Sequence, residues 1–296
     1  MTVTGKEREV ELLVDAHARI GEGPVWDAAL RRLVWLDILN GLVHLYDPVS
    51  GHDETAGVGK AVGAAAPRAS GGLVLALEDG FAAFDPASEE LTPLAPVEAD
   101  QPGLRMNDGK CDRAGRFWAG SMEWDGEHPV GSLYRLDPDH AVTRVVTGVR
   151  ISNGLGWSPD GRLMYYIDSP TYRIDVFDFD LGQGSLANRR TLVEVPREWG
   201  MPDGMTVDAE GCLWVAFWGG WAVRRLTPDG TLVETLRLPV SQVSSCTFGG
   251  PDGEDLYITS ATDGLSDEQL RAEPHAGALF RARPGVAGGP TWSFAG

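Results

Sequence analysis

Short hydrophobic runs, rich in aromatic and β-branched residues, recur through the chain and predict β-strands. No window shows a convincing helical period. The main runs are LVWLDI (33–38), LVLALE (73–78), RFWAGSM (116–122), LMYYID (163–168), CLWVAF (212–217) and DLYITS (255–260). A second strand-like run follows each of them and ends in a polar turn: HLYDP (44–48), AAFDP (82–86), LYRLDP (133–138), VFDFD (176–180), VRRLTP (223–228) and LFRARP (279–284). This pattern predicts an all-β chain.

The spacing of these runs divides the chain into repeated units. In most units a glycine-containing turn, such as DRAGR (112–116) or DAEGC (208–212), precedes the main run. Units of roughly 45 residues have the length expected of β-propeller blades, and their regularity argues against an open sandwich. We therefore predict a six-bladed β-propeller as a single domain over residues 1–296. The N-terminal strand Val10–Val14 is expected to complete the last blade and close the ring.

The predicted architecture brings one position of each blade to the central channel. The innermost strands run along the channel, so the residues that open them form a ring: Glu22, Ala64, Asn107, Asn153, Asp203 and Ser245. Converging carboxylate and amide oxygens suit a hard divalent cation such as Ca²⁺. Taken singly, Asn-Gly and Asp-Gly are also common in tight turns. The match across blades favours a metal site.

A second set of residues is expected at the same channel mouth. The next strand of each blade returns to that face and ends at Asp37, Glu123, Asp168, Trp218 or Ser260. Arg105, Asn107 and Glu123 come from one blade and predict a polar clamp for a hydroxylated ligand. A surface ion pair is the alternative interpretation of Arg105 and Glu123.

Composition restricts the possible partners. A formal charge of −18 repels nucleic acid and anionic lipid, so neither nucleic acid nor a membrane is expected as a partner. No run approaches the roughly 18 apolar residues of a membrane span. The start, MTVTGKEREVELLVD, lacks the basic head and apolar core of a signal peptide. Cys111, Cys212 and Cys246 show no metal-ligand spacing and predict reduced thiols in a cytoplasmic protein.

Several motifs resemble the SMP-30/gluconolactonase/regucalcin-like family of six-bladed propellers. They run in order from about Glu11 to Arg283: GEGPVWD, RMNDGKCDRAGRFWAGSM, ISNGLGWSPDG, YYIDS, PDGMTVDAEGCLWVA and CTFGGPDGEDLYITSA. FWGGWAV and GLSDEQLRAEPHAGALF resemble the bacterial sugar-lactonase branch. The resemblance implies one divalent cation held by Glu22, Asn153 and Asp203. It also implies that Arg105, Asn107 and Glu123 bind the sugar.

The activity implied by this resemblance is hydrolysis of a sugar lactone, an aldonolactone such as gluconolactone or a pentonolactone. A dication can polarise the lactone carbonyl and activate a water, and Asp203 is the candidate catalytic residue that orients or deprotonates that water. Ca²⁺ is the preferred ion, while Zn²⁺, Mn²⁺, Mg²⁺ and Fe²⁺ stay open. No GxSxG motif occurs, and the six histidines fall away from the predicted ring. The alternatives are a metal-dependent phosphotriesterase or arylesterase, and a calcium-binding regulatory protein of regucalcin type.

Overall fold

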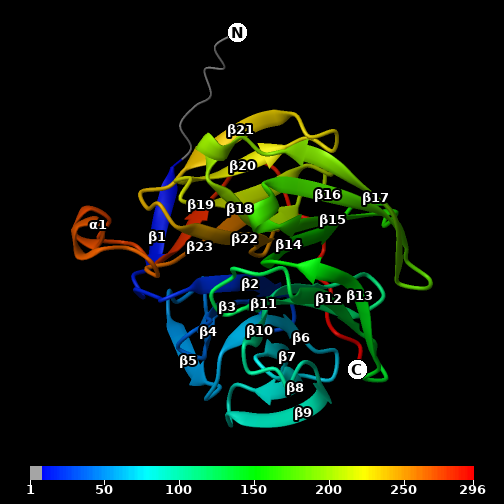
Figure 1. Cartoon of the computed structure of the whole chain (residues 1–296). Coiled ribbons are helices and arrows are strands. Elements are labelled where there is room, and N and C mark those ends of the chain that lie inside the picture. Colours follow the sequence, from blue (N-terminus) through cyan, green and yellow to red (C-terminus); the bar gives the residue numbers. More distant parts are fainter. Residues whose placement is uncertain (1–8) are drawn as a thin grey trace.

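A computed structural model describes residues 9–296 as a six-bladed β-propeller (Figure 1). Each blade is a four-stranded antiparallel sheet, and the first strands of neighbouring blades contact one another around the central channel. The predicted fold class is confirmed. The predicted domain includes residues 1–8, and the expectation that the chain has no signal peptide also concerns them. These residues lie outside the part of the chain that the structure describes. No helix among the described residues is long and apolar enough to cross a membrane.

The blades follow one another in chain order, each built from the channel outward. Blade 1 contains β2 (Gly21–Asp27), β3 (Arg32–Asp37), β4 (Leu42–Tyr46) and β5 (Asp53–Gly57). Blade 2 contains β6 (Val62–Pro67), β7 (Leu73–Leu77), β8 (Gly80–Asp85) and β9 (Glu90–Pro96). Blade 3 contains β10 (Leu104–Cys111), β11 (Phe117–Glu123), β12 (Gly131–Leu136) and β13 (Val142–Val149).

The second half of the chain repeats this order. Blade 4 contains β14 (Ser152–Trp157), β15 (Leu163–Asp168), β16 (Arg173–Asp180) and β17 (Ser185–Glu194). Blade 5 contains β18 (Met201–Val207), β19 (Leu213–Trp218), β20 (Ala222–Leu226) and β21 (Leu232–Arg237). Blade 6 contains β22 (Val243–Gly249), β23 (Asp255–Ser260), β24 (Leu279–Ala282) and, at its outer edge, β1 (Val10–Val14). Short helices lie in loops: η1 (Ser169–Thr171), η2 (Arg197–Trp199) and α1 (Asp267–Ala272).

The N-terminal strand closes the ring as predicted. β1 pairs antiparallel with β24, with Val10 opposite Ala282 and Leu12 opposite Phe280. This pairing covers an edge of β24 that would otherwise present unpaired backbone groups. The two ends of the propeller are thereby held in one sheet.

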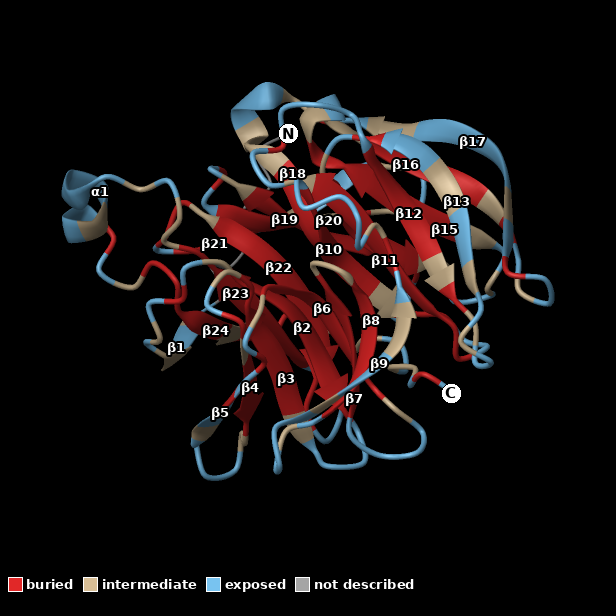
Figure 2. Ribbon diagram, turned by 60° about the horizontal axis from the view of Figure 1, so that its bottom comes forward, coloured by how far each residue is buried: buried red, intermediate tan, exposed pale blue. Residues whose placement is uncertain are grey.

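The hydrophobic core is divided among the contacts between blades. One cluster joins Leu36 of blade 1 to Leu75 and Phe84 of blade 2, and comparable clusters join the other neighbouring blades. The second strands, such as β7 and β19, are almost entirely buried, whereas outer strands such as β17 are largely exposed (Figure 2). Each fully buried large apolar side chain stabilises the fold by about 1.5–3 kcal/mol. The blades therefore stabilise one another in sequence around the ring.

A β-bulge interrupts every innermost strand near its beginning. In β14, for example, Asn153 pairs with Ile167 and Leu155 with Tyr166, which leaves Gly154 as the extra residue. Equivalent register shifts occur in β2, β6, β10, β18 and β22. A bulge bends its strand and redirects the neighbouring side chains. The bulges coincide with the ring of channel residues expected from the sequence.

The chain ends in a segment that crosses the opposite end of the channel, here called the C-terminal strap (residues 285–296). The Gly288 amide donates to the Gly253 carbonyl in blade 6, and the Phe294 amide donates to the Pro67 carbonyl in blade 2. Isolated bridges attach the strap to blade 5 and again to blade 2. The strap therefore connects nearly opposite sides of the propeller.

Candidate active site

The predicted ring residues lie at the beginning of the innermost strands, with their side chains buried. Glu22, Asn153 and Asp203 are only 4%, 5% and 7% exposed. Each lies within or beside the bulge of its strand. Asn107, from blade 3, donates through Nδ2 to Asn153 Oδ1 at 3.3 Å and to the Ser152 carbonyl at 2.8 Å. Two predicted site residues from different blades are thus in direct contact.

Glycines beside the ring allow neighbouring innermost strands to approach closely. A Cβ on Gly154 would lie 2.5 Å from the Asp203 carbonyl oxygen, closer than atoms can pack. A Cβ on Gly204 would lie 2.1 Å from Ser245 Oγ. Only glycine permits this approach of one backbone to its neighbour. The glycines that follow Asn153 and Asp203 therefore bring neighbouring strands together and narrow the channel at this level.

The carboxyl groups of the ring are held in an environment that disfavours their charge. Burial, and then the carboxylate of Asp108, raises the pKa of Glu22 to about 8. Burial likewise raises the pKa of Asp203 well above its ordinary value, and the charges of Glu22 and Asp108 add to this effect. Protonation or a cation would relieve this repulsion. The channel mouth therefore has a strong preference for added positive charge.

The donor set fits a divalent cation. Glu22 and Asp203 supply carboxylate oxygens, and Asn153 supplies an amide oxygen, which are the ligand types that hard cations prefer. The amide nitrogen of Asn153 donates to Ser169 Oγ at 2.8 Å. This bond fixes the amide so that its oxygen is the atom left to accept from Asn107 or to meet a cation. Two carboxylates would balance the formal charge of a dication, and three protein ligands would leave coordination positions for water or a substrate.

Arg105 lies in the same group and retains an unused donor. Its Nη1 donates to Asn107 Oδ1 at 2.7 Å and to the Met106 carbonyl at 3.0 Å. Its Nε is buried and has no hydrogen-bond partner among the described residues. Burial lowers the pKa of Arg105 to about 10, so the side chain stays charged at neutral pH. A buried donor of this kind is satisfied when a ligand brings an acceptor oxygen.

Glu123 is engaged elsewhere in this structure. Its Oε2 accepts from the His128 amide and lies 2.9 Å from His128 Nδ1. Bonds from His128 lower the pKa of Glu123, and Glu123 in turn raises the pKa of His128. Arg105 instead faces Trp124, with the guanidinium carbon 5.6 Å from the ring centroid. The structure therefore joins Arg105 to Asn107 but joins Glu123 to a histidine that the sequence analysis set aside.

Two of the other strand-end residues hold loops in place. The carboxylate of Asp37 accepts from the amides of Arg19 and Ile20, which lead into β2. The carboxylate of Asp168 does the same for the loop that leads into β14, accepting from the amides of residues 150 and 151. These aspartates position the entry loops of the channel strands.

Sequence reasoning missed Asp108 and Lys110, which lie deeper in the channel. Asp108 is buried and affects the pKa of both Glu22 and Asp203. Lys110 reaches from β10 to β18, where its Nζ donates to the Met205 carbonyl at 2.7 Å. Both residues stand in the RMNDGK motif, so the motif itself contained the clue. Regular strand alternation would place Asn107 and Asp108 on opposite faces, and the bulge removes that constraint.

A different acidic group lies outside the channel mouth. Ligand atoms of Asp208, Glu210 and Cys212 lie within 4.8 Å of one another. Arg225 binds both carboxylates, at 2.7 Å from Asp208 and 2.6 Å from Glu210. The Trp214 indole also donates to Asp208 at 3.0 Å. Because these partners already compensate the charge, this group holds blade 5 together and is a poor candidate for a cation site.

Comparison with known proteins places this geometry in a family. Residues 20–262 match the family model described as the SMP-30/Gluconolactonase/LRE-like region. Regucalcin from Xenopus laevis is 40% identical over 295 residues, covering 97% of this chain and 99% of that protein.

Two solved structures extend the comparison. The calcium-binding protein regucalcin from Agrobacterium tumefaciens has 30% identity and a TM-score of 0.94, with 97% of each chain covered. A gluconolactonase from Xanthomonas campestris has 25% identity and a TM-score of 0.76, with 96% of this chain and 93% of that chain covered. The chain therefore belongs to the SMP-30/gluconolactonase/LRE-like family of six-bladed β-propellers.

Proposed function

We propose that this protein hydrolyses sugar lactones, aldonolactones such as gluconolactone or a pentonolactone, with the help of one divalent cation. The observation that supports this most is the burial of Glu22, Asn153 and Asp203 at matched positions of the channel strands, together with Arg105, whose Nε has no partner among the described residues. A cation site next to a free cationic donor suits a polar, oxygen-rich substrate. The similarity to a gluconolactonase points to the same chemistry.

In this proposal the cation is held by Glu22, Asn153 and Asp203, and Ca²⁺ is the preferred ion. When bound, the cation would act as a Lewis acid, which would polarise the lactone carbonyl and make a nearby water more acidic. The similarity to a solved structure described as a calcium-binding protein supports Ca²⁺.

The protein's own residues would then divide the remaining work. Asp203 orients the attacking water and accepts its proton as the water oxygen bonds to the carbonyl carbon. The ring C–O bond breaks, and the released oxygen takes up a proton to give the aldonic acid. Arg105 and Asn107 hold the substrate hydroxyls, and Asn107 also steadies Asn153 through their hydrogen bond. Glu123 can join the substrate contacts when it leaves His128.

The test is an assay of several aldonolactones with metal-stripped protein, to which Ca²⁺, Mn²⁺, Mg²⁺, Fe²⁺ and Zn²⁺ are restored one at a time. We expect hydrolysis to fall to the spontaneous rate after stripping and to return with at least one ion. Hydrolysis that never exceeds the spontaneous rate with any lactone or ion would contradict the proposal.

A calcium-binding regulatory role is the second candidate, because the curated relatives at 39–41% identity are regucalcins. In that case Ca²⁺ would bind to the same carboxylates without turnover of any lactone. Calcium binding in a calorimeter combined with no lactonase activity would select this role. The cytoplasm is the proposed location for either function, because Cys111, Cys212 and Cys246 are buried free thiols.

A further inference from the structure

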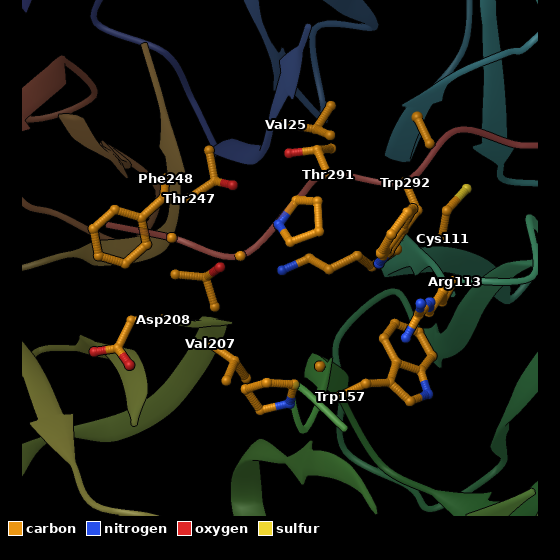
Figure 3. Close-up of a pocket in the computed structure, with 18 of the residues that line it drawn as sticks. Val25, Cys111, Arg113, Trp157, Val207, Asp208, Thr247, Phe248, Thr291 and Trp292 are labelled. Carbon is orange, nitrogen blue, oxygen red and sulfur yellow. The ribbon is translucent and has the colours of Figure 1, made fainter. Parts of the chain in front are cut away.

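The propeller contains a cavity toward the end of the channel opposite the candidate active site. It has a volume of about 430 Å³, within the range of small-molecule sites. Its wall includes Trp157 and Val207, the last residues of β14 and β18, and Phe248 near the end of β22 (Figure 3). Asn153 is the second residue of the strand that ends at Trp157, so about 13 Å of strand separates these two residues.

Lys110 and Asp108 form the floor of this distal cavity. The Lys110 side chain crosses the channel from β10 to the Met205 carbonyl in β18. Glu22, Asn153 and Asp203 do not line the cavity. Gly23, beside Glu22, and the ring residue Ser245 do line it, so the cavity extends along the channel to the level of the ring without including the three proposed cation ligands.

The C-terminal strap completes the wall of the cavity on the solvent side. Gly288, Gly289 and Trp292 of the strap line it, and the strap is bonded to blades on either side of the opening. Trp292 and Trp157 lie on one side of the cavity with Arg113 between them, and Phe248 lies on the other side (Figure 3). Flat apolar walls of this kind favour an aromatic or otherwise planar ligand.

The charged groups around the cavity leave a positive charge without compensation. Arg113 lies with its guanidinium 5.8 Å from the centroid of the Trp292 ring, and within residues 9–296 it has no carboxylate at ion-pair distance. The Asp208 carboxylate is bound by Arg225 and points away from the cavity (Figure 3). Asp108 lies next to Lys110 on the floor and offsets its charge. An anionic ligand would therefore find its partner in Arg113.

We propose that the distal cavity binds a small, flat, largely apolar anion, such as an aromatic carboxylate or sulfonate. Its rings would pack against Trp157 and Trp292, and its acidic group would meet Arg113, which lies between them (Figure 3). This site does not depend on the lactonase proposal, because it uses none of the residues assigned to that reaction.

The test uses 8-anilinonaphthalene-1-sulfonate as the probe and N-phenyl-1-naphthylamine as its uncharged counterpart. Binding of each is measured by fluorescence titration of the full chain. We expect saturable binding of one sulfonate probe per chain. Arg113→Met should weaken binding of the sulfonate probe about five- to tenfold and change binding of the uncharged compound less than twofold. Arg113 is exposed, so this variant should fold.

A blocking variant makes the location testable. A Cβ on Gly289 would meet only the Val207 carbonyl oxygen, at 4.0 Å, so Gly289→Phe can place a ring at the cavity wall without a backbone clash. We expect it to weaken probe binding at least tenfold. Gly57→Phe is the matched control, because a Cβ on Gly57 of the outer strand β5 would meet only Glu89 Oε1, at 3.7 Å. The proposal is overturned if the parent shows no saturable binding, if Gly289→Phe binds like the parent, or if both glycine variants lose binding equally.

Discussion

At the scale of single residues, Asp203 is a buried carboxyl group whose charged form is disfavoured in the folded protein without a cation. Burial raises the pKa of its carboxyl, and the charges of Glu22 and Asp108 add to this effect. We expect Asp203→Ala to abolish lactone hydrolysis and to weaken binding of the cation strongly. The metal-free variant should unfold at the same temperature as the parent or a slightly higher one, because one of several repelling charges is gone. Metal content, thermal unfolding and turnover of gluconolactone check these outcomes.

Asp139→Ala, which changes a carboxylate in an exposed turn, is the control for Asp203→Ala. It should match the parent in all three measurements. A folded Asp203→Ala protein that hydrolyses lactone at nearly the parental rate would sink the proposed mechanism.

Arg105 has a hydrogen-bond donor available for a substrate, because its buried Nε has no partner among the described residues. We expect Arg105→Ala to reduce kcat/KM for sugar lactones by the equivalent of about 1–3 kcal/mol, with bound metal largely retained. Asn107→Ala should reduce turnover similarly and should also weaken metal binding a little, because Asn107 bonds to Asn153. Loss of metal from Arg105→Ala would mean that the arginine supports the cation site and not the substrate.

The strength of the contact between Glu123 and His128 should depend on pH. Glu123 raises the pKa of His128, so the stabilisation from that histidine is complete below its ordinary pKa of 6.5 and is lost as pH rises through the raised value. The pKa of Glu123 is lowered, so its contribution is present above 4.5 and is lost as pH falls. The contact should therefore be strongest between about pH 4.5 and 6.5. Glu123→Gln should lower the pKa of His128 in an NMR titration, and an unchanged His128 titration would show that the contact is absent in solution.

At the scale of elements, the bulged innermost strand decides which side chains meet. The hydrophobic period and the turn motifs predicted six blades and the closing strand Val10–Val14, since each blade repeats the same local pattern. The channel positions of Glu22, Asn153 and Asp203 could be anticipated because equivalent positions of the blades form a ring, whereas their selection as cation ligands came from the family resemblance. Asp108 was missed, although it stands in the same motif as Asn107, because alternation along an ideal strand would place it on the opposite face, and only the structure shows the bulge. Similarly, His128 reaches Glu123 through a loop whose path no period specifies.

Gly154 offers a test of this view of the bulges. In Gly154→Ala the added Cβ would collide with the Asp203 carbonyl oxygen, so β14 and β18 must move apart. We expect the free energy of unfolding to fall by about 1–3 kcal/mol and metal affinity to fall with it. Gly156→Ala, in the same strand, meets only the side-chain ends of Val207 and Met205 and should change metal affinity little. Equal metal affinity in the two variants would contradict a role for the bulge in shaping the site.

At the scale of the whole molecule, the closing strand is the contact that makes the ring complete. Deletion of residues 1–14 would remove β1 and uncover the edge of β24. We expect a loss of about 3–5 kcal/mol in the free energy of unfolding, from the lost strand pairing and from Leu13 and Val14, which pack on blades 1 and 6. The uncovered edge should also promote self-association. Deletion of residues 1–8, which leaves β1 intact, is the reference variant: calorimetric unfolding and the molecular mass in solution are compared between the two deletions.

The pairing of β1 with β24 also determines when the ring can close during synthesis of the chain. More than 260 residues separate the two strands, so at roughly 5–20 residues per second the ribosome delivers β24 some 15–50 s after β1. Until then blades 1 to 5 form an open arc, and the face of blade 1 that carries Trp35 has no blade 6 to cover it. An apolar face left open for that time is a natural binding site for chaperones. The risk of aggregation or degradation of a newly made molecule should therefore increase with the time taken to synthesise its last blade.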